Sequence, residues 1–184
     1  MSSVAANRRR AELREPTLDP ASSCRSTNRR GRCGRLAPMH VTARAEYAVR
    51  ALVELAANGG GPMTAEAIAT AQDIPERFLK AILGDLRRDG LLVSIRGAEG
   101  GYRLGRAAGE ISVAEAIRAI DGPLAYVRGV RPHELTYEGS SEPLRDVWIA
   151  ARRSLRDVLE HVSVADVASG RLPKSVSSRL GDAV

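Results

Sequence analysis

The stretch SIRGAEGGYRLGR, residues 94–106, holds four glycines and three arginines and lies between two apolar segments. Residues 91–95 have the composition of a strand, residues 97–101 that of a turn, and residues 102–104 that of a returning strand. The phosphate-binding loop of an enzyme would instead end in Lys-Ser or Lys-Thr and lead directly into a helix. The stretch therefore predicts a β-hairpin whose tip contacts something outside the protein.

Three helices are predicted before this hairpin. Apolar residues at helical spacing predict the first from Ala45, ended by the sequence NGGGP at 58–62. Thr64 is the expected N-cap of a short second helix, and Pro75 the expected first residue of a third helix that reaches Arg88. Two short helices joined by a tight turn form a helix-turn-helix, whose second helix can enter the major groove of DNA.

The third helix has two contrasting faces. One is apolar and is expected to pack on the first two helices: Phe78, Leu79, Ile82, Leu83 and Leu86. The opposite face carries Arg77, Lys80, Gly84 and Arg87. Taken alone, this basic face fits an ordinary solvated surface as well as a DNA contact. The hairpin that follows favours a DNA contact. Arg96 and Arg103 are expected to flank the tip of the hairpin and to contact phosphates or the minor groove.

The net charge of +6 does not by itself support nucleic-acid binding. Residues 1–38 contain nine arginines and three acidic residues, so residues 39–184 carry 19 basic and 19 acidic groups. Within the predicted folded part, residues 74–106 form a local basic patch of seven basic and four acidic groups. Any DNA-binding surface there depends on this patch.

Residues 1–38 lack helical or strand periodicity and are expected to be a disordered, arginine-rich tail. We favour a dispensable tail over a basic arm that attracts polyanions. Patterned sequence begins directly after Met39, which leaves both Met1 and Met39 open as the start. The chain contains no apolar run of the roughly 20 residues that a membrane span needs and no secretory signal, so we expect a soluble, cytoplasmic protein.

Four segments resemble the Rrf2 family of bacterial winged-helix regulators, which includes IscR, NsrR and CymR. They are MHVTARAEYAVRALVELA (39–56), AIATAQDIPERFLKAILGDLRRDGLLVSIRGAEGGYRLGR (67–106), ISVAEAIRAIDGP (111–123) and the helix around Trp148. The resemblance spans Met39 to about Gly170, and the RGxxGGYxL pattern of the hairpin is its most specific part.

The resemblance implies roles for individual residues. Pro75, Arg77 and Lys80 stand at positions that read bases in family members, and Arg96 stands at the arginine of the hairpin, called the wing. Cluster-binding members tend to have small polar or acidic residues where Arg77 and Lys80 stand, so their operator cannot be transferred to this chain. The complete predicted DNA-contact set is Pro75, Arg77, Lys80, Arg96, Gly97, Gly100, Gly101, Tyr102 and Arg103.

The carboxyl-terminal part carries a second helical pattern. Ser112 and Glu115 form a predicted capping box that opens a helix through Ile120. After the poorly patterned residues 123–142, apolar residues recur at gaps of four and three, as in a coiled coil. This seam consists of Leu144, Trp148, Ala151, Leu155, Val158 and Val162. Packing within the chain is one explanation, but the resemblance implies a homodimer built on this helix, and hence a roughly palindromic DNA site.

Cluster-binding relatives hold an iron-sulfur centre with three cysteines in the loop before the dimer helix, and this loop here has none. Both cysteines, Cys24 and Cys33, lie in the tail. Glu46 stands where an acidic residue completes the cluster in nitric-oxide-sensing relatives, but without sulfur ligands we interpret it as a solvated helix residue. The three histidines, His40, His133 and His161, are isolated in the sequence. We therefore expect no metal site, no iron-sulfur cluster and no other cofactor.

Together these features predict a mainly α protein with a small β wing: a winged helix-turn-helix domain plus a long C-terminal dimerisation helix. The expected parts are a tail (1–38), the DNA-binding domain (39–122), a linker or sensor loop (123–142), the dimerisation helix with a short following helix (143–170) and a flexible tail (171–184). The predicted function is a homodimeric, sequence-specific transcriptional regulator, a repressor, that binds double-stranded DNA and responds to a small molecule, a partner protein or no effector. The alternative is a winged-helix module that binds a metabolic enzyme. Because no nucleophile-base pair, catalytic carboxylate pair or metal-ligand spacing is present, we do not predict an enzyme.

Overall fold

The amino-terminal helices begin and end where their local sequence signals lie. The computed structural model describes residues 41–97 and 100–181. α1 (Ala43–Ala57) follows Thr42 and α2 (Ala65–Ala71) follows Thr64, and each threonine hydroxyl accepts a hydrogen bond from a first-turn amide. Such caps satisfy amides that the helix itself leaves unbonded. α3 (Glu76–Arg88) completes the predicted helix-turn-helix.

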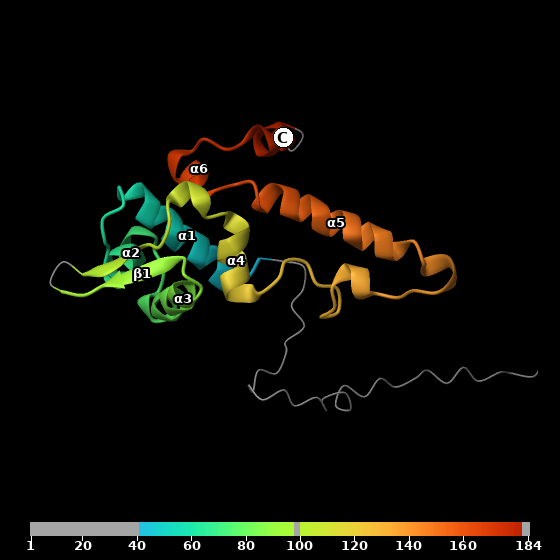
Figure 1. Ribbon diagram of the computed structural model, residues 1–184, viewed down its shortest axis with the longest axis horizontal. Coiled ribbons are helices and arrows are strands. Elements are labelled where there is room, and N and C mark those ends of the chain that lie inside the picture. The colour runs from blue at the N-terminus through green and yellow to red at the C-terminus, as the bar shows by residue number, and fades with distance from the viewer. Residues whose placement is uncertain (1–40, 98–99, 182–184) are drawn as a thin grey trace, which may run out of the picture. The chain divides into compact units, whose positions relative to one another are not determined.

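The predicted wing is confirmed as a two-stranded antiparallel hairpin. β1 (Leu92–Ile95) pairs with β2 (Gly101–Leu104), with Leu92 opposite Leu104 at one end and Ile95 opposite Gly101 at the other. Leu91 and Leu92 are buried at the start of the hairpin. These contacts attach the hairpin to the end of α3 (Figure 1).

One apolar core joins elements from both ends of the described chain. After η1 (Ala108–Glu110), α4 (Val113–Asp121) packs on α1, and so does α6 (Val164–Ser169). The core contains Leu52, Leu55, Ile68, Leu79, Ile82, Leu83, Leu86, Leu92, Ile111 and Val164, all of which are fully buried. Thr42 additionally donates a hydrogen bond of 2.8 Å to Asp121, so the start of α1 is joined to the end of α4. The chain therefore returns to the DNA-binding domain after α5, whereas we expected that domain to end at residue 122.

Two capping boxes mark the starts of α4 and α6. The predicted box of Ser112 and Glu115 is confirmed, and Ser163 and Asp166 form a second one. Burial acts to raise the pKa of Glu115, but hydrogen bonds from Ser112 and the pairing with Arg106 together leave it lowered. Hydrogen bonds from Ser163 lower the pKa of Asp166. Both carboxylates bond the serine that caps their own helix, and Glu115 also pairs with Arg106 at 2.8 Å, so we assign them to helix initiation and local packing.

Between α4 and α6 lie η2 (Pro132–Glu134), η3 (Gly139–Ser141) and the long helix α5 (Leu144–Leu159). α7 (Lys174–Leu180) follows α6, which differs from our expectation of a flexible tail over 171–184. The predicted tail of residues 1–38 falls outside the described residues. Within the described part of the chain, no helix is long and apolar enough to cross a membrane.

Candidate nucleic-acid interface

α3 combines a buried apolar side with an exposed basic side. Leu79, Ile82, Leu83 and Leu86 are completely buried, whereas Arg77, Lys80 and Arg87 are exposed. Residues three or four apart lie on the same side of a helix, so the apolar set anchors α3 and the basic set faces outward. Pro75 is also exposed, but it is the N-cap of α3 and not its first residue as expected.

Phe78 is not a core residue, contrary to our expectation. Its side chain is 46% exposed, while the neighbouring Leu79 is completely buried. Successive helical residues differ by about 100° in direction, so Leu79 occupies the centre of the apolar stripe and leaves Phe78 at its edge. The guanidinium carbon of Arg77 lies 4.7 Å from the centroid of the Phe78 ring, a cation-π arrangement.

Ion pairs modify the basic side of α3. The ammonium of Lys80 lies 2.7 Å from the carboxylate of Glu76, and the hydrogen bond and charge of Glu76 raise the pKa of Lys80. Asp85 pairs with both Arg44, at 2.8 Å, and Arg88. Since a nearby carboxylate offsets positive charge, Glu76 and Asp85 reduce the positive potential that Lys80 and Arg88 present to a phosphate. The Glu76 pair was not anticipated, although its i,i+4 spacing is visible in the sequence.

The end of the wing next to its turn is rich in glycine. Arg96 directly follows β1 and is exposed, and Gly97 has a φ of 114°, a conformation that side chains rarely adopt. The amide of Gly100 donates a hydrogen bond of 3.0 Å to the carbonyl of Gly97. The predicted phosphate contacts of these residues remain predictions. Exposure of Arg96 and Gly97 is compatible with them, whereas Gly100 is half-buried and its amide is bonded to Gly97.

The returning strand of the wing is joined to the segment just before α2. Backbone groups of Tyr102 and Met63 exchange two hydrogen bonds, of 2.7 and 2.9 Å. At Gly101 the backbone comes so close to Met63 that a Cβ atom would clash with its carbonyl oxygen. Tyr102 is half-buried against the core, so Gly101 and Tyr102 have a clear structural role in holding the wing.

Arg103 does not flank the wing tip, as we had expected. It lies opposite Val93, further from the turn than the pair of Ile95 and Gly101. Its side chain is exposed and lines a depression with residues of the α1 end and of the segment after β2. A DNA contact by Arg103 would therefore involve the base of the wing.

α5 keeps much of its apolar seam exposed. None of its side chains is fully buried, and Leu144 and Leu155 are each 38% exposed. Trp148 is partly covered by its own chain, because its indole nitrogen donates a hydrogen bond of 3.1 Å to the hydroxyl of Tyr137. Ala151 and Val158 are also half-buried.

Val162 does not extend the seam, which corrects our expectation. α5 ends at Leu159, and Val162 is buried against the helical core, where its carbonyl accepts a hydrogen bond of 2.9 Å from the amide of Val113. Val162 follows Val158 by four residues, a spacing that fits a heptad repeat. The capping box at Ser163 instead starts a new helix directly after Val162.

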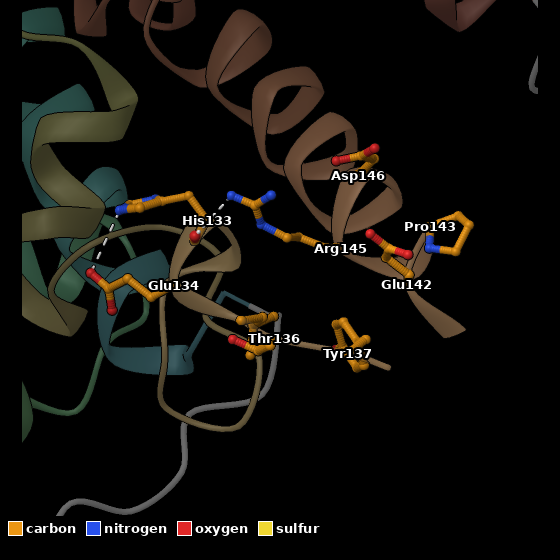
Figure 2. A pocket seen from close by; sticks show the side chains of 9 residues that line it. His133, Glu134, Thr136, Tyr137, Glu142, Pro143, Arg145 and Asp146 are labelled. Atoms are coloured by element: carbon orange, nitrogen blue, oxygen red, sulfur yellow. Dashed lines mark hydrogen bonds and ion pairs between the residues drawn. The ribbon is translucent and has the colours of Figure 1, made fainter. Parts of the chain in front are cut away.

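The loop before α5 borders a polar cavity of about 500 Å³ (Figure 2). Its lining residues come from both the loop and the start of the helix: His133, Glu134, Leu135, Thr136, Tyr137, Glu142, Pro143, Arg145 and Asp146. Arg145 donates a hydrogen bond of 3.2 Å to the carbonyl of His133, and the His133 ring lies 3.5 Å from Glu134. The cavity combines carboxylates with a guanidinium, which suits a small polar molecule that carries both charges.

The described residues do not fit an iron-sulfur cluster. Among residues 41–97 and 100–181, no group of three His, Cys, Asp or Glu side chains is placed to hold a metal ion. Glu46 instead lies 3.5 Å from Arg50, and a ring nitrogen of His161 lies 2.9 Å from the carbonyl of Asp157. Clusters require thiolates, and Cys24 and Cys33 lie outside the described residues, as does His40.

Comparison with known proteins relates this arrangement to transcriptional regulators. Residues 41–170 match the Rrf2 family, described as iron-dependent transcriptional regulators. A helix-turn-helix (HTH) transcriptional regulator of Mycobacterium tuberculosis is 49% identical over 145 residues, which cover 78% of this chain and 90% of that protein. CymR of Bacillus subtilis, also an HTH-type transcriptional regulator, is 32% identical over 132 residues, which cover 71% of this chain and 91% of CymR.

Solved structures lead to the same family. The structure of B. subtilis CymR, the global cysteine regulator of that organism, has a TM-score of 0.62 and 31% identity and covers 71% of this chain and 96% of CymR. That of IscR from T. potens has a TM-score of 0.59 and 31% identity, with coverage of 71% and 87%. These relatives are regulators and not enzymes, and they do not support the alternative of an enzyme-binding module. The chain belongs to the Rrf2 family of DNA-binding, winged helix-turn-helix transcriptional regulators.

Proposed function

We propose that this chain acts in the cytoplasm as a homodimeric repressor that binds a roughly palindromic DNA site. The observation that carries this proposal is the exposed basic side of α3, anchored by four buried leucine and isoleucine side chains and followed directly by the wing. An anchored helix with an outward basic side is the geometry by which helix-turn-helix proteins enter the major groove. A repressor acts by occupying such a site.

The two DNA-binding elements have different tasks in this proposal. Arg77 and Lys80, in the first half of α3, face the groove, where each prefers the O6 and N7 acceptors of guanine. Arg96 and the amide of Gly97 contact the phosphate backbone, because both residues are exposed. Helix contacts thus determine sequence, and wing contacts determine affinity.

The dimer is supported by the exposed seam of α5. A 16-residue helix without a fully buried side chain gains little stability from its own chain. Leu144 and Leu155, with Val147 at 55% exposure, offer an apolar surface that a second copy of α5 would cover. Two-fold symmetry of the protein then requires two related DNA half-sites.

We further propose that the signal is not an iron-sulfur cluster, because the described residues lack its donor set. The mixed charges of the cavity in Figure 2 support a small polar effector. This cavity lies between the loop and α5, so a molecule bound there contacts the helix that we assign to the dimer.

The test is selection of genomic DNA fragments by the full-length protein, followed by binding to the selected site. Arg77→Ala and Lys80→Ala should each weaken binding by about 1–3 kcal/mol and relax base preference. Arg96→Ala should weaken all sequences alike, and Arg171→Ala, an exposed arginine after α6, serves as the control. Failure of the wild type to prefer any fragment would overturn the proposed function, and unchanged preference in both helix variants would overturn the assignment of base readout.

A further inference from the structure

Phe78 stands apart from the other large apolar residues of α3. Leu79, Ile82, Leu83 and Leu86 are completely buried, whereas Phe78 is 46% exposed in the first turn of the helix. This aromatic ring lies beside the basic side of a DNA-binding helix and is not part of the core. Its exposed surface is available for an apolar contact with a bound partner.

Phe78 also contacts the predicted base-reading arginine. The guanidinium of Arg77 lies over the Phe78 ring at 4.7 Å from its centroid. A guanidinium stacked on an aromatic face loses much of its rotational freedom, so its five donors point in fewer directions. The ring thus restricts the side chain that is expected to hydrogen-bond guanine.

The next turn of α3 permits close approach to the bases. Ala81 is exposed and lies three residues after Phe78 and four after Arg77, and an added Cβ at Gly84 would meet no atom within 4 Å. Small side chains on the exposed side allow the helix backbone to come near the floor of the major groove. Arg77 and Phe78 then both reach base edges, because the N-terminal residues of a recognition helix contact them first.

We propose that Phe78 is a specificity-determining residue that contacts the C5-methyl group of a thymine and positions Arg77 on an adjacent guanine. Thymine is the base that offers an apolar group in the major groove, and an aromatic ring is a suitable partner for it. This inference rests on the proposed function, since it assumes that α3 enters the groove. It adds a prediction about the operator, namely that each half-site contains a thymine next to the guanine read by Arg77.

The test replaces each thymine of the selected operator in turn with deoxyuridine, which lacks only the methyl group. For the full-length wild type, replacement of one particular thymine in each half-site should matter. Each such single replacement should weaken binding about fourfold, which corresponds to the transfer free energy of one buried methyl group. Phe78→Ala should bind the thymine site more weakly and no longer distinguish the two bases. Phe78→Leu should keep part of the methyl discrimination but relax the guanine preference, and Phe78→Tyr, which retains a ring, should restore that preference.

Leu172→Ala, which removes a different exposed apolar side chain, is the matched control and should behave as the wild type does. Because Phe78 is not buried, its variants should melt within a few degrees of the wild type, and a large decrease would identify Phe78 as structural and overturn the inference. A wild type that selects an operator but is insensitive to every uracil replacement overturns this inference alone. A wild type that selects no operator overturns the proposed function as well.

Discussion

Glu160, which directly follows α5, accepts a hydrogen bond from the guanidinium of Arg118 in α4. Arg156 of α5 donates to the same carboxylate at 2.9 Å. These pairs connect the helix assigned to the dimer with the DNA-binding domain. The hydrogen bond from Arg156 is the largest cause that lowers the pKa of Glu160, and Arg118 lowers it further.

Replacement of Glu160 by glutamine should therefore destabilise the protein in a pH-dependent way. A carboxyl group whose pKa is lowered by folding contributes stability above its ordinary pKa of about 4.5, and this contribution is lost as the pH falls through the lower, folded value. At pH 7 we expect a loss below about 1 kcal/mol for Glu160→Gln, since the group is partly exposed. Urea unfolding at neutral and at acidic pH should show that the difference narrows below about pH 4.5, and a constant difference would contradict the prediction.

Glu76→Gln should strengthen binding to duplex DNA. The carboxylate of Glu76 pairs with Lys80 and would repel phosphates, so its neutralisation leaves Lys80 available to the DNA. We expect a several-fold gain in affinity and a salt dependence steeper by about one released counterion, measured by fluorescence anisotropy over a range of salt concentrations. Glu110→Gln, which neutralises an exposed carboxylate outside α3, is the control, and an equal gain there would attribute the effect to net charge alone.

Gly101→Ala should loosen the wing and destabilise the domain. The new Cβ would clash with the carbonyl of Met63, whose backbone pairs with Tyr102. We expect a loss of about 1–3 kcal/mol in the free energy of unfolding and weaker binding to all DNA sequences. Gly109→Ala adds the same methyl group where no atom lies within 4 Å, so it should be neutral. Equal unfolding midpoints for the two variants would rule out the clash.

Leu155→Asp should convert the homodimer to a monomer. Leu155 is 38% exposed on the apolar seam of α5, and a carboxylate there would be buried without a partner in the dimer. Arg153→Asp places a carboxylate at an exposed position on the side of α5 opposite the seam and should leave the dimer intact. Sedimentation equilibrium measures the two masses, and a dimer in both variants would show that this seam is not the interface.

Full-length protein purified without oxygen should be colourless and contain no stoichiometric iron or sulfide. The reason is that the described residues lack a set of three metal-binding side chains, and the two cysteines stand in residues 1–38. Operator binding should be the same before and after treatment with nitric oxide. Visible absorbance that survives replacement of Cys24 and Cys33 by serine would contradict this expectation.

The sequence by itself determined the end of α1, the starts of α2 and α4, and the wing. Thr64, Ser112 and Asn58 mark helix ends through contacts with residues at most four positions away, so both partners of each contact are visible in the local sequence. Gly97, with its φ of 114°, likewise has a conformation that its own backbone geometry reserves for glycine. The family resemblance followed from these same segments, and the match over residues 41–170 confirms it.

Only the tertiary structure decided which face of each element is covered, and by what. Phe78 belongs to the apolar stripe of α3 by periodicity, yet the width of that stripe in contact with the core depends on how α3 packs on α1 and α2. Val162 fits the heptad of α5 but is buried beside Val113, and Gly101 is required by the backbone of Met63. In each case the deciding partner lies far away in the sequence, and periodicity describes one element without specifying the surface that it meets.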